Sequence, residues 1–412
     1  MGTKVCIIGA GPAGLMAAIF AAGANTETTV VEANTTAGRK LLRTGGGRCN
    51  LTHCDSIDDF IRALGSGMRF IRYCLHEFSP QAVMKFFADK GLETRIERDG
   101  CVFPASDRAS DVRDVLLAEA RRLGVRFLYD RRAESVSKGS DGFFEVRTVR
   151  ETVRAEKVIV ATGGVSWPET GSAGSGYVFA RELGHTIIEP RGALLPLLTS
   201  ERWVSELAGT ALEKVRISTR AGKSKITVGG AMLFTQDGIG GPAALDLSRL
   251  IADYLPSYER PIEIAVDMVV DLDQRAVEKS VVQACAENPK KTPTNILSGF
   301  VPRRVAAVLC RQLNTDGNLT CGQLKKDERK RLVVLLKALP LSVRNSRPIT
   351  EAMVTRGGVS TEEINAKTME SKICPGLFFA GEVINVDGPC GGYNLQICWS
   401  TGGLAGRSAA CG

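Results

Sequence analysis

The chain has 412 residues, of which 44% are hydrophobic and 24% are charged, and its formal net charge is +8 at pH 7. These proportions are ordinary for a globular protein, and they exclude a disordered chain or a small disulfide scaffold. Aromatic residues make up 6% of the chain and do not alternate with a long basic block. We therefore expect the positive charge to be solvated surface, with no nucleic-acid partner.

The twelve cysteines are scattered along the chain, and no C-x-x-C pair is present. This pattern predicts neither a metal site nor a disulfide framework. Residues 5–22 form an apolar stretch, but three glycines interrupt it. A strand, a turn and a helix explain that stretch better than a signal sequence does. We expect a cytoplasmic protein with reduced thiols and no membrane partner, and the sequence assigns no oligomeric state.

A glycine-rich turn stands between the first apolar strand and an apolar helix. Its glycines have the spacing Gly9-x-Gly11-x-x-Gly14. Gly9 permits a tight turn, Gly11 lets a pyrophosphate approach the backbone, and Gly14 lets the helix pack closely on the strand. The N–H groups at the start of the helix then face the phosphates. This pattern predicts a dinucleotide-binding unit.

The second predicted strand ends at Glu32, eighteen residues after Gly14. A carboxylate at this point accepts hydrogen bonds from both hydroxyls of an adenosine ribose and repels a 2′-phosphate. The sequence therefore predicts FAD or NAD and disfavours NADP. Four cations, Arg39, Lys40, Arg43 and Arg48, surround the three glycines that follow. Such a loop suits a pyrophosphate or an electron-rich ring system.

The next part of the chain alternates helical and extended patterns. We predict two helices over residues 57–87, broken at Ser79 and Pro80, a hairpin over 94–103 and a helix over 107–123. Strands are predicted over residues 125–129, 133–136, 143–149 and 157–164. The last of these is a buried strand that ends in glycines, and a Gly/Ser loop follows it. Ligands bind at such carboxyl ends of parallel strands.

Composition changes near Pro190 and changes back near residue 350. Short alternating runs predict an antiparallel sheet or small barrel over residues 191–275, and helical patterns follow over 276–345. We therefore predict an α/β protein with a discontinuous Rossmann-type domain, residues 1–190 and 350–412. The insert, residues 191–349, is expected to form a substrate or cap domain.

The C-terminal segment returns to the Rossmann pattern. A buried strand ends at Gly381 and Glu382, a glycine-rich turn follows over residues 388–392, and an apolar helix is predicted over 397–410. The positive end of that helix could stabilise negative charge on a reduced flavin.

Three long motifs carry a resemblance to a known family. They read TGGGRCN at residues 44–50, ATGGxSxPxTGS at 161–172 and AGExxxxDGxCGGYNLQ at 380–396. The chain resembles the BaiN/YhiN-like, aminoacetone-oxidase-like flavoproteins, whose FAD-binding fold is similar to that of glutathione and fumarate reductases. The resemblance implies an FAD-dependent oxidoreductase that exchanges a hydride with a small organic substrate. The reaction is expected to be reduction of an enone-type C=C bond or oxidation of an amine, with NADH or NADPH as a possible transient electron donor.

The same resemblance assigns the site. Glu382 would lie at the ribitol or pyrophosphate, the backbone near Ala133 at the adenine, and residues 394–396 at the pyrimidine edge of the flavin. The catalytic residue is not identified, and the candidates are Arg48, Cys49 and Tyr393. The predicted cofactor-binding residues are Gly9, Gly11, Pro12, Ala13, Gly14, Glu32, Arg39, Lys40, Gly46, Arg48, Cys49, Asn50, Ala133, Thr162, Gly163, Gly381, Glu382, Asn394, Leu395 and Gln396.

Two alternatives stay open. Cys49 and Cys54 have the spacing of a redox dithiol, which predicts a flavin thiol/disulfide oxidoreductase. The net charge is compatible with an FAD-containing protein that binds or modifies RNA. His53 is a further candidate proton donor.

Overall fold

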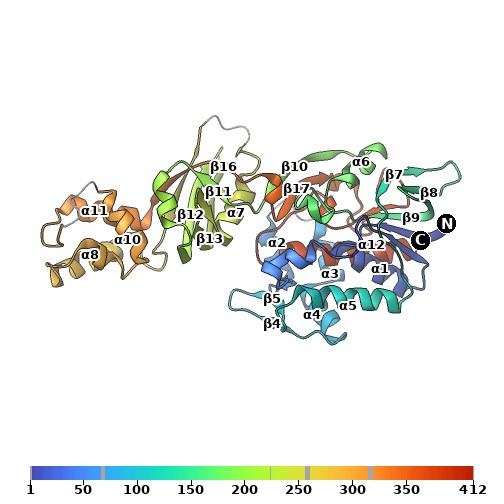
Figure 1. The fold of residues 1–412 in the computed structure, drawn as a ribbon, viewed down its shortest axis with the longest axis horizontal. Coiled ribbons are helices and arrows are strands. Elements are labelled where there is room, and N and C mark those ends of the chain that lie inside the picture. Colours follow the sequence, from blue (N-terminus) through green and yellow to red (C-terminus); the bar gives the residue numbers. More distant parts are fainter. Residues whose placement is uncertain (1, 66–69, 223, 256–259, 314–318, 412) are drawn as a thin grey trace. The chain divides into compact units, whose positions relative to one another are not determined.

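The structure is a computed structural model that describes residues 2–65, 70–222, 224–255, 260–313 and 319–411. The chain divides into two compact units (Figure 1). The first contains Met1–Gly192 and Ile349–Gly412, and the second contains Ala193–Pro348. Each unit is described by itself.

A seven-stranded sheet forms the centre of the first unit, in the order β6-β2-β1-β9-β8-β7, with β18 paired to β9. The strands pair in parallel except around β8, which is antiparallel to both of its neighbours. Apolar side chains such as Ile7 and Ile159 are completely buried, because helices cover the parallel part of the sheet. The strands are β1 (Gly2–Ile8), β2 (Thr28–Val31), β6 (Arg126–Leu128), β7 (Ala133–Lys138), β8 (Phe144–Thr148), β9 (Thr152–Val160) and β18 (Leu377–Phe379).

The two ends of the chain meet through a close helix contact. Helix α1 (Pro12–Gly23) packs on α12 (Tyr393–Cys411), which begins four residues before its predicted start. A Cβ atom at Gly402 would lie 2.3 Å from the carbonyl oxygen of Ala13, and one at Gly406 would lie 2.2 Å from that of Ala17. Glycine is therefore required on this face of α12, because any side chain would separate the helices.

The sequence predicted two helices over residues 57–87, but the described residues contain three. The predicted break holds, since Ser79 caps the helix that starts at Pro80. A second break occurs at Gly65, whose φ of 99° ends the first helix in a conformation that favours glycine. The remaining helices of the unit are α2 (Ile57–Leu64), α3 (Arg72–Glu77), α4 (Pro80–Ala88), α5 (Ala109–Arg122) and α6 (Ser175–Glu182).

Two small sheets complete the first unit. The predicted hairpin over residues 94–103 is confirmed, and β3 (Thr52–His53) joins β4 (Thr94–Ile96) and β5 (Cys101–Pro104) in one antiparallel sheet. β10 (Ile187–Ala193) pairs with β17 (Val354–Val359).

The second unit contains a closed barrel in the order β11-β14-β13-β12-β15-β16. The predicted β-barrel-like insert is thus confirmed, but the helical extent predicted for residues 276–345 is wrong at its end. Residues 339–346 form β16, because Leu339, Leu341 and Val343 alternate into the barrel core and pair with β15. The strands are β11 (Leu197–Thr199), β12 (Ala211–Ala221), β13 (Ser224–Phe234), β14 (Gly238–Gly240), β15 (Ile262–Asp267) and β16 (Leu339–Ser346), and α7 (Gly241–Ile251) packs on β13.

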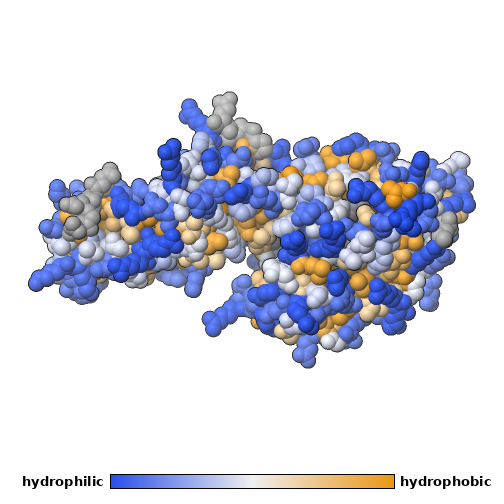
Figure 2. Space-filling model, viewed as in Figure 1, coloured by the Kyte–Doolittle hydropathy of each residue, from blue (hydrophilic) through white to orange (hydrophobic). Residues whose placement is uncertain are grey.

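In the described part of the chain, four helices follow β15 and precede β16. They are α8 (Gln274–Glu287), α9 (Pro293–Leu297), α10 (Arg303–Arg311) and α11 (Lys326–Lys337). Their buried residues, such as Val281, Leu309 and Leu336, belong to the same core as the barrel. Hydrophilic side chains cover much of the outside of these helices, at the left of Figure 2. None of the helices in the described part of the chain combines the length and the apolar composition that a membrane span requires.

Candidate active site

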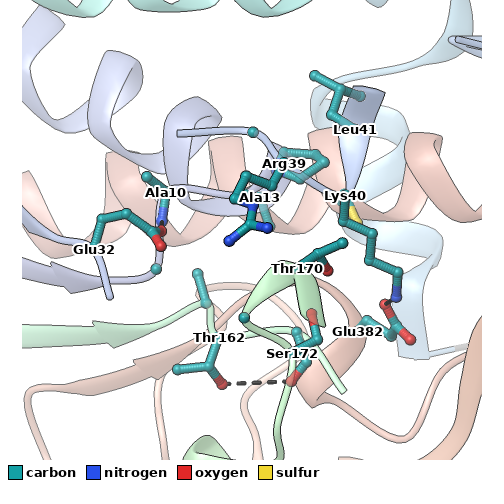
Figure 3. Close-up of a pocket in the computed structure, with 18 of the residues that line it drawn as sticks. Ala10, Ala13, Glu32, Arg39, Lys40, Leu41, Thr162, Thr170, Ser172 and Glu382 are labelled. Carbon is teal, nitrogen blue, oxygen red and sulfur yellow. Dashed lines mark hydrogen bonds and ion pairs between the residues drawn. The ribbon is translucent and has the colours of Figure 1, made fainter. Parts of the chain in front are cut away.

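A cleft opens in the first unit at the carboxyl ends of β1, β2 and β9. It encloses about 1220 Å³ of empty space, counting its open mouth. The predicted site residues that line it are Gly9, Gly11, Pro12, Ala13, Glu32, Arg39, Lys40, Ala133, Thr162, Gly163, Glu382, Asn394 and Leu395. The predicted residues that do not line it are Gly14, Gly46, Arg48, Cys49, Asn50, Gly381, Tyr393 and Gln396. Figure 3 shows that residues from both ends of the chain face this space.

The turn after β1 depends on two glycines. Gly9 has a φ of 103°, and a Cβ atom there would lie 2.5 Å from the carbonyl oxygen of Ala161 at the end of β9. A Cβ atom at Gly14 would lie 1.9 Å from the carbonyl oxygen of Gly9. Gly14 therefore lies behind the turn and allows the close packing of helix on strand, while Gly9 makes the turn itself.

The surroundings of Gly11 differ from those of Gly9 and Gly14. Its φ of −78° is accessible to any residue, and a Cβ atom there would meet nothing within 4 Å. The helix that it caps has no side-chain cap and no acidic residue in its first turn. The first N–H groups of α1 are thus available at the cleft, with open space beside them, and the helix dipole favours an anion there. This cradle fits a pyrophosphate.

Glu32 lies at the end of β2 and is buried. One carboxylate oxygen accepts the N–H of Ala10 at 2.7 Å, and the other accepts the backbone and side-chain N–H groups of Asn34 at 2.8 and 2.6 Å. Asn34 also accepts a hydrogen bond of 2.6 Å from Arg39. The carboxylate is fixed in orientation and keeps part of its acceptor capacity for the hydroxyls of a ribose.

Lys40 and Glu382 form the most buried charge pair of the cleft wall. The Lys40 ammonium lies 2.5 Å from Glu382 Oε2 and 2.6 Å from Ser166 Oγ. The other oxygen of Glu382 accepts from Ser166 Oγ and from the N–H of Thr355, both at 2.7 Å. Burial alone would raise the pKa of Glu382, but the Lys40 charge and these hydrogen bonds hold it below its ordinary value. The carboxylate is therefore charged at neutral pH.

Thr355 is a site residue that the sequence analysis did not identify. Its hydroxyl oxygen accepts the N–H groups of Val165 and Ser166 at 2.9 and 3.2 Å, and its own N–H holds Glu382. Thr355 thus joins β17 to the loop after β9 and to the C-terminal segment. The only sequence signal nearby is the glycine pair at residues 357–358.

The first turn of α12 also lines the cleft. Asn394 and Leu395 line the cleft. The side chain of Asn394, however, is hydrogen-bonded to the glycine turn that precedes the helix. Its oxygen accepts from the N–H of Gly388 at 2.8 Å, and its nitrogen donates to the carbonyl of the same residue at 2.9 Å. The side chain therefore shapes the glycine turn. The groups that this helix end offers to a ligand are the backbone N–H groups of its first turn.

Gln396 is completely buried and directed away from the cleft. Its amide oxygen accepts from Thr52 Oγ1 at 2.6 Å, and its nitrogen donates to the carbonyl of Phe78 and to Ser400 Oγ, both at 2.9 Å. These bonds tie α12 to β3 and to the end of α3.

Arg48 and Cys49 also have protein partners. The Arg48 guanidinium pairs with Glu97 and Asp107 and lies 3.9 Å from the ring centroid of Phe103. Cys49 is completely buried, and burial raises the pKa of its thiol to about 12. Such a thiol is protonated at neutral pH and attacks a disulfide poorly. The buried Cys49 thiol does not support the dithiol alternative. The ion pairs of Arg48 do not support a direct electrostatic role for its guanidinium.

Tyr393 takes part in a network of three side chains. Its hydroxyl donates to Asp55 Oδ2 at 2.6 Å, and Asp55 Oδ1 lies 3.0 Å from His53 Nδ1. The rings of His53 and Tyr393 stack with centroids 5.0 Å apart. The structure thus brings together two of the candidate proton donors, and Tyr393 directly precedes the cleft residues at the start of α12.

These observations match the chemistry of FAD. An uncapped helix N-terminus with open space beside Gly11 suits the pyrophosphate, and the fixed carboxylate of Glu32 suits the adenosine ribose. The α12 N-terminus suits an anionic ring system. The residues present therefore fit the cofactor.

The comparisons with known proteins agree with this geometry. A family model described as the HI0933-like protein Rossmann domain matches residues 3–408. The chain is 33% identical over 411 residues to the 3-dehydro-bile acid delta(4,6)-reductase of Clostridium scindens, covering 99% of both chains. It is 30% identical over 402 residues to the ribosomal RNA dihydrouridine synthase of Escherichia coli, covering 96% of this chain and 95% of that protein.

One solved structure shows the same fold. The 3-ketosteroid-delta4-(5alpha)-dehydrogenase from Rhodococcus jostii RHA1 has a TM-score of 0.53 and 17% identity, covering 99% of this chain and 97% of that one. The predicted Rossmann-type FAD-binding fold and the predicted class, an FAD-dependent oxidoreductase, are confirmed. The chain therefore belongs to the HI0933-like family, which confirms the BaiN/YhiN-like resemblance of its motifs.

Proposed function

We propose that the protein reduces C=C bonds that are conjugated to a carbonyl group. The observation that carries the proposal is the cleft at the carboxyl ends of β1, β2 and β9, where the N-termini of α1 and α12 and the fixed Glu32 suit FAD. The names of the two relatives indicate which type of bond is reduced. One is named for reduction of delta(4,6) bonds in a 3-dehydro-bile acid, and the other for making dihydrouridine in ribosomal RNA.

These two substrates have the same reacting group. In a 3-oxo steroid with Δ4,6 bonds and in a uracil ring, the C=C bond is conjugated to a carbonyl. In each case a hydride adds to the β-carbon and a proton to the α-carbon, so that two electrons and two hydrogens enter the bond. The amine-oxidation alternative uses the opposite direction of transfer, and the name of neither relative points to it.

Bound FAD would supply the hydride exchange. In our proposal, the first N–H groups of α1 bind the pyrophosphate and Glu32 binds the ribose. The N-terminus of α12 stabilises negative charge at the pyrimidine edge of the flavin. Lys40 and Glu382 hold the cleft wall together near the ribitol.

We place Tyr393 as the donor of the proton. Its phenol is held by one oxygen of Asp55, and His53 contacts the other oxygen of that carboxylate, where it can return a proton through the network. A phenol can give up its proton to a carbon acid–base step, whereas a guanidinium does not readily do so. Asp55 and His53 act as positioning residues.

We propose NADH or NADPH as the transient electron donor. The described residues of the second unit form a barrel with helices rather than a second Rossmann sheet, so a nicotinamide would have to reach the flavin directly. Such a donor binds, reacts and leaves before the substrate is reduced.

The test is anaerobic stopped-flow spectroscopy of the FAD-reconstituted protein. NADH or NADPH should bleach the flavin absorbance, and a 4-en-3-one steroid or a uridine-containing RNA should restore it. Mass spectrometry should then find the substrate two hydrogens heavier. A protein that stays colourless after reconstitution would contradict cofactor binding. A reduced flavin that every conjugated substrate leaves unoxidised, or an amine that reduces it, would contradict the direction of the reaction.

A further inference from the structure

The whole excess of positive charge lies in one segment of the chain. Residues 274–337, which contain α8 to α11, hold 13 Lys and Arg residues and 5 Asp and Glu residues, an excess of 8. The complete chain has 53 basic and 45 acidic residues, so the remaining residues have 40 of each and no net charge. The charge is therefore a local property of the helical part of the second unit.

We infer that these helices form a docking surface for the phosphate backbone of RNA. The inference rests on the proposed function and names RNA as its substrate class. A free steroid has no row of phosphates to neutralise, whereas a polyanion binds such a surface by releasing its counterions.

Hydrogen bonds between backbone groups assemble the centre of the surface. The N–H of Cys321 donates to the carbonyl of Lys291 at 2.8 Å, and the N–H of Gly322 donates to the carbonyl of Pro289 at 2.9 Å. The turn that carries Lys290 and Lys291 is thus fixed against the segment that leads into α11.

Two more lysines begin that helix. The N–H of Lys325 is held by Glu328 at 2.7 Å, and Lys326 is the first residue of α11. Lys290, Lys291, Lys325 and Lys326 are all exposed, and none of the four forms an ion pair within the described residues. We call these four residues the lysine cluster.

Some of the cations elsewhere in the protein are neutralised by ion pairs. In the first unit, Arg95, Arg122 and Arg154, for example, each pair with a nearby carboxylate. Within the helical segment, Arg311 pairs with Glu206 and Lys337 pairs with Asp267 of β15. The lysine cluster keeps its charge exposed, which is the arrangement that phosphate binding requires.

The composition of the segment indicates contact with phosphates rather than with bases. Phe300 is the one aromatic residue in the sequence of residues 274–337, and it is packed against the barrel core. Base stacking therefore contributes little, and binding should depend strongly on salt and weakly on sequence. A membrane surface fits less well, because α11 directs Leu332, Val333 and Leu336 into the core and leaves no broad apolar face for insertion.

The experiment compares two variants of the full FAD-loaded protein with equal net charge. The first carries Lys290→Gln, Lys291→Gln, Lys325→Gln and Lys326→Gln. The control carries the same change at four exposed lysines of the first unit, Lys85, Lys138, Lys367 and Lys372. Binding of a fluorescein-labelled RNA hairpin is measured by anisotropy across a salt series, with the same hairpin as DNA and phosphatidylserine vesicles as competitors.

The cluster variant should bind RNA about 100-fold more weakly at about 0.1 M salt, and its log–log salt slope should fall by about 3. The control should bind like the original protein. Equal weakening of both variants, no RNA binding at about 50 mM salt, or preferential binding of DNA or vesicles would each overturn the inference.

A second readout separates this inference from the proposed function. Reduction of a free 4-en-3-one steroid by the cluster variant should proceed at the original rate if the flavin reaction is as proposed. If neither the original protein nor the cluster variant reduces any conjugated substrate, the proposed function is wrong. The RNA-binding measurement then still tests whether the lysine cluster binds RNA. An unchanged flavin spectrum shows that the variant is folded.

Discussion

Lys40 and Glu382, which are 342 residues apart in the chain, form an ion pair of 2.5 Å in the wall of the cleft. The pair closes the site by joining the loop after β2 to the segment after β18. Ser166 and Thr355 complete the hydrogen bonds of the carboxylate. Four segments of the first unit thus converge on one buried charge.

Replacing Lys40 by Met should destabilise the first unit, because Glu382 would keep its negative charge without its cation. The side chains are 19% and 15% exposed, so we expect a loss on the order of 2 kcal/mol, below the cost of breaking a fully buried pair. Chemical denaturation of the variant measures the loss. A free energy of unfolding equal to that of the original protein would show that the pair contributes nothing.

The same pair predicts a pH dependence. The pKa of Glu382 is lowered in the folded protein from an ordinary value of 4.5, so its contribution to stability is fully present above that pH. It is lost as the pH falls through the lowered pKa. The stability difference between the original protein and Lys40→Met should be largest near neutral pH and should shrink below about 4.5. A difference that grows in acid would contradict this sign.

Gly11→Ala should weaken cofactor binding without changing the stability of the fold. The new methyl group meets no protein atom within 4 Å, so the protein without cofactor should keep its stability. The methyl group would instead occupy the space that we assign to the pyrophosphate, and FAD affinity should fall roughly tenfold to a hundredfold. Gly23→Ala, in the same helix and also without neighbours, is the matched control. Fluorescence titration with FAD measures both.

Gly406→Ala should weaken the contact between the two ends of the chain. Its Cβ atom would lie 2.2 Å from the carbonyl oxygen of Ala17, so α1 and α12 must separate, at a cost of about 1–3 kcal/mol. Gly403→Ala is a suitable comparison, since its Cβ atom would meet the ring of Phe20 at an ordinary 3.4 Å. Thermal unfolding should show a lower midpoint for Gly406→Ala than for Gly403→Ala. Equal midpoints would refute the close contact.

Tyr393→Phe should slow reoxidation of the flavin by the substrate, because that half-reaction consumes the proton. It should leave reduction of the flavin by the electron donor unchanged. Loss of a positioned acid typically costs about 10²–10⁴ in rate. Flavin reduction by the donor should keep its rate, while reoxidation by a conjugated substrate should slow by that factor. Tyr73→Phe, at an exposed tyrosine, should change neither rate. If both half-reactions of Tyr393→Phe run normally, another group supplies the proton.

Cys54→Ser tests the dithiol alternative. Cys49 is buried and its thiol is protonated at neutral pH, so we expect no electron transfer through the pair. The variant should reduce and reoxidise its flavin at the original rates in the stopped-flow assay. A selective loss of disulfide reduction would restore the alternative.

The sequence by itself determined the parts of the site that depend on local backbone geometry. The strand, turn and helix around Gly9 and Gly14 could be predicted, because a tight turn and close packing admit only glycine there. Glu32 could be predicted from its position at the end of the second strand. Alternating residues predicted a sheet or barrel through β12, β13 and β15. The alternation of β16 was not recognised, because that strand follows directly on a helix.

Only the tertiary structure decided which side chains are available to a ligand. Gln396 and Asn394 belong to a specific motif, yet their amides are bound by Thr52, Phe78 and Gly388. The Arg48 guanidinium is likewise engaged by acids far along the chain. A polar group that folding buries must find partners, and those partners come from segments that are distant in sequence. A motif therefore predicts where the backbone lies, and the packed fold decides which of its side chains point at the cofactor.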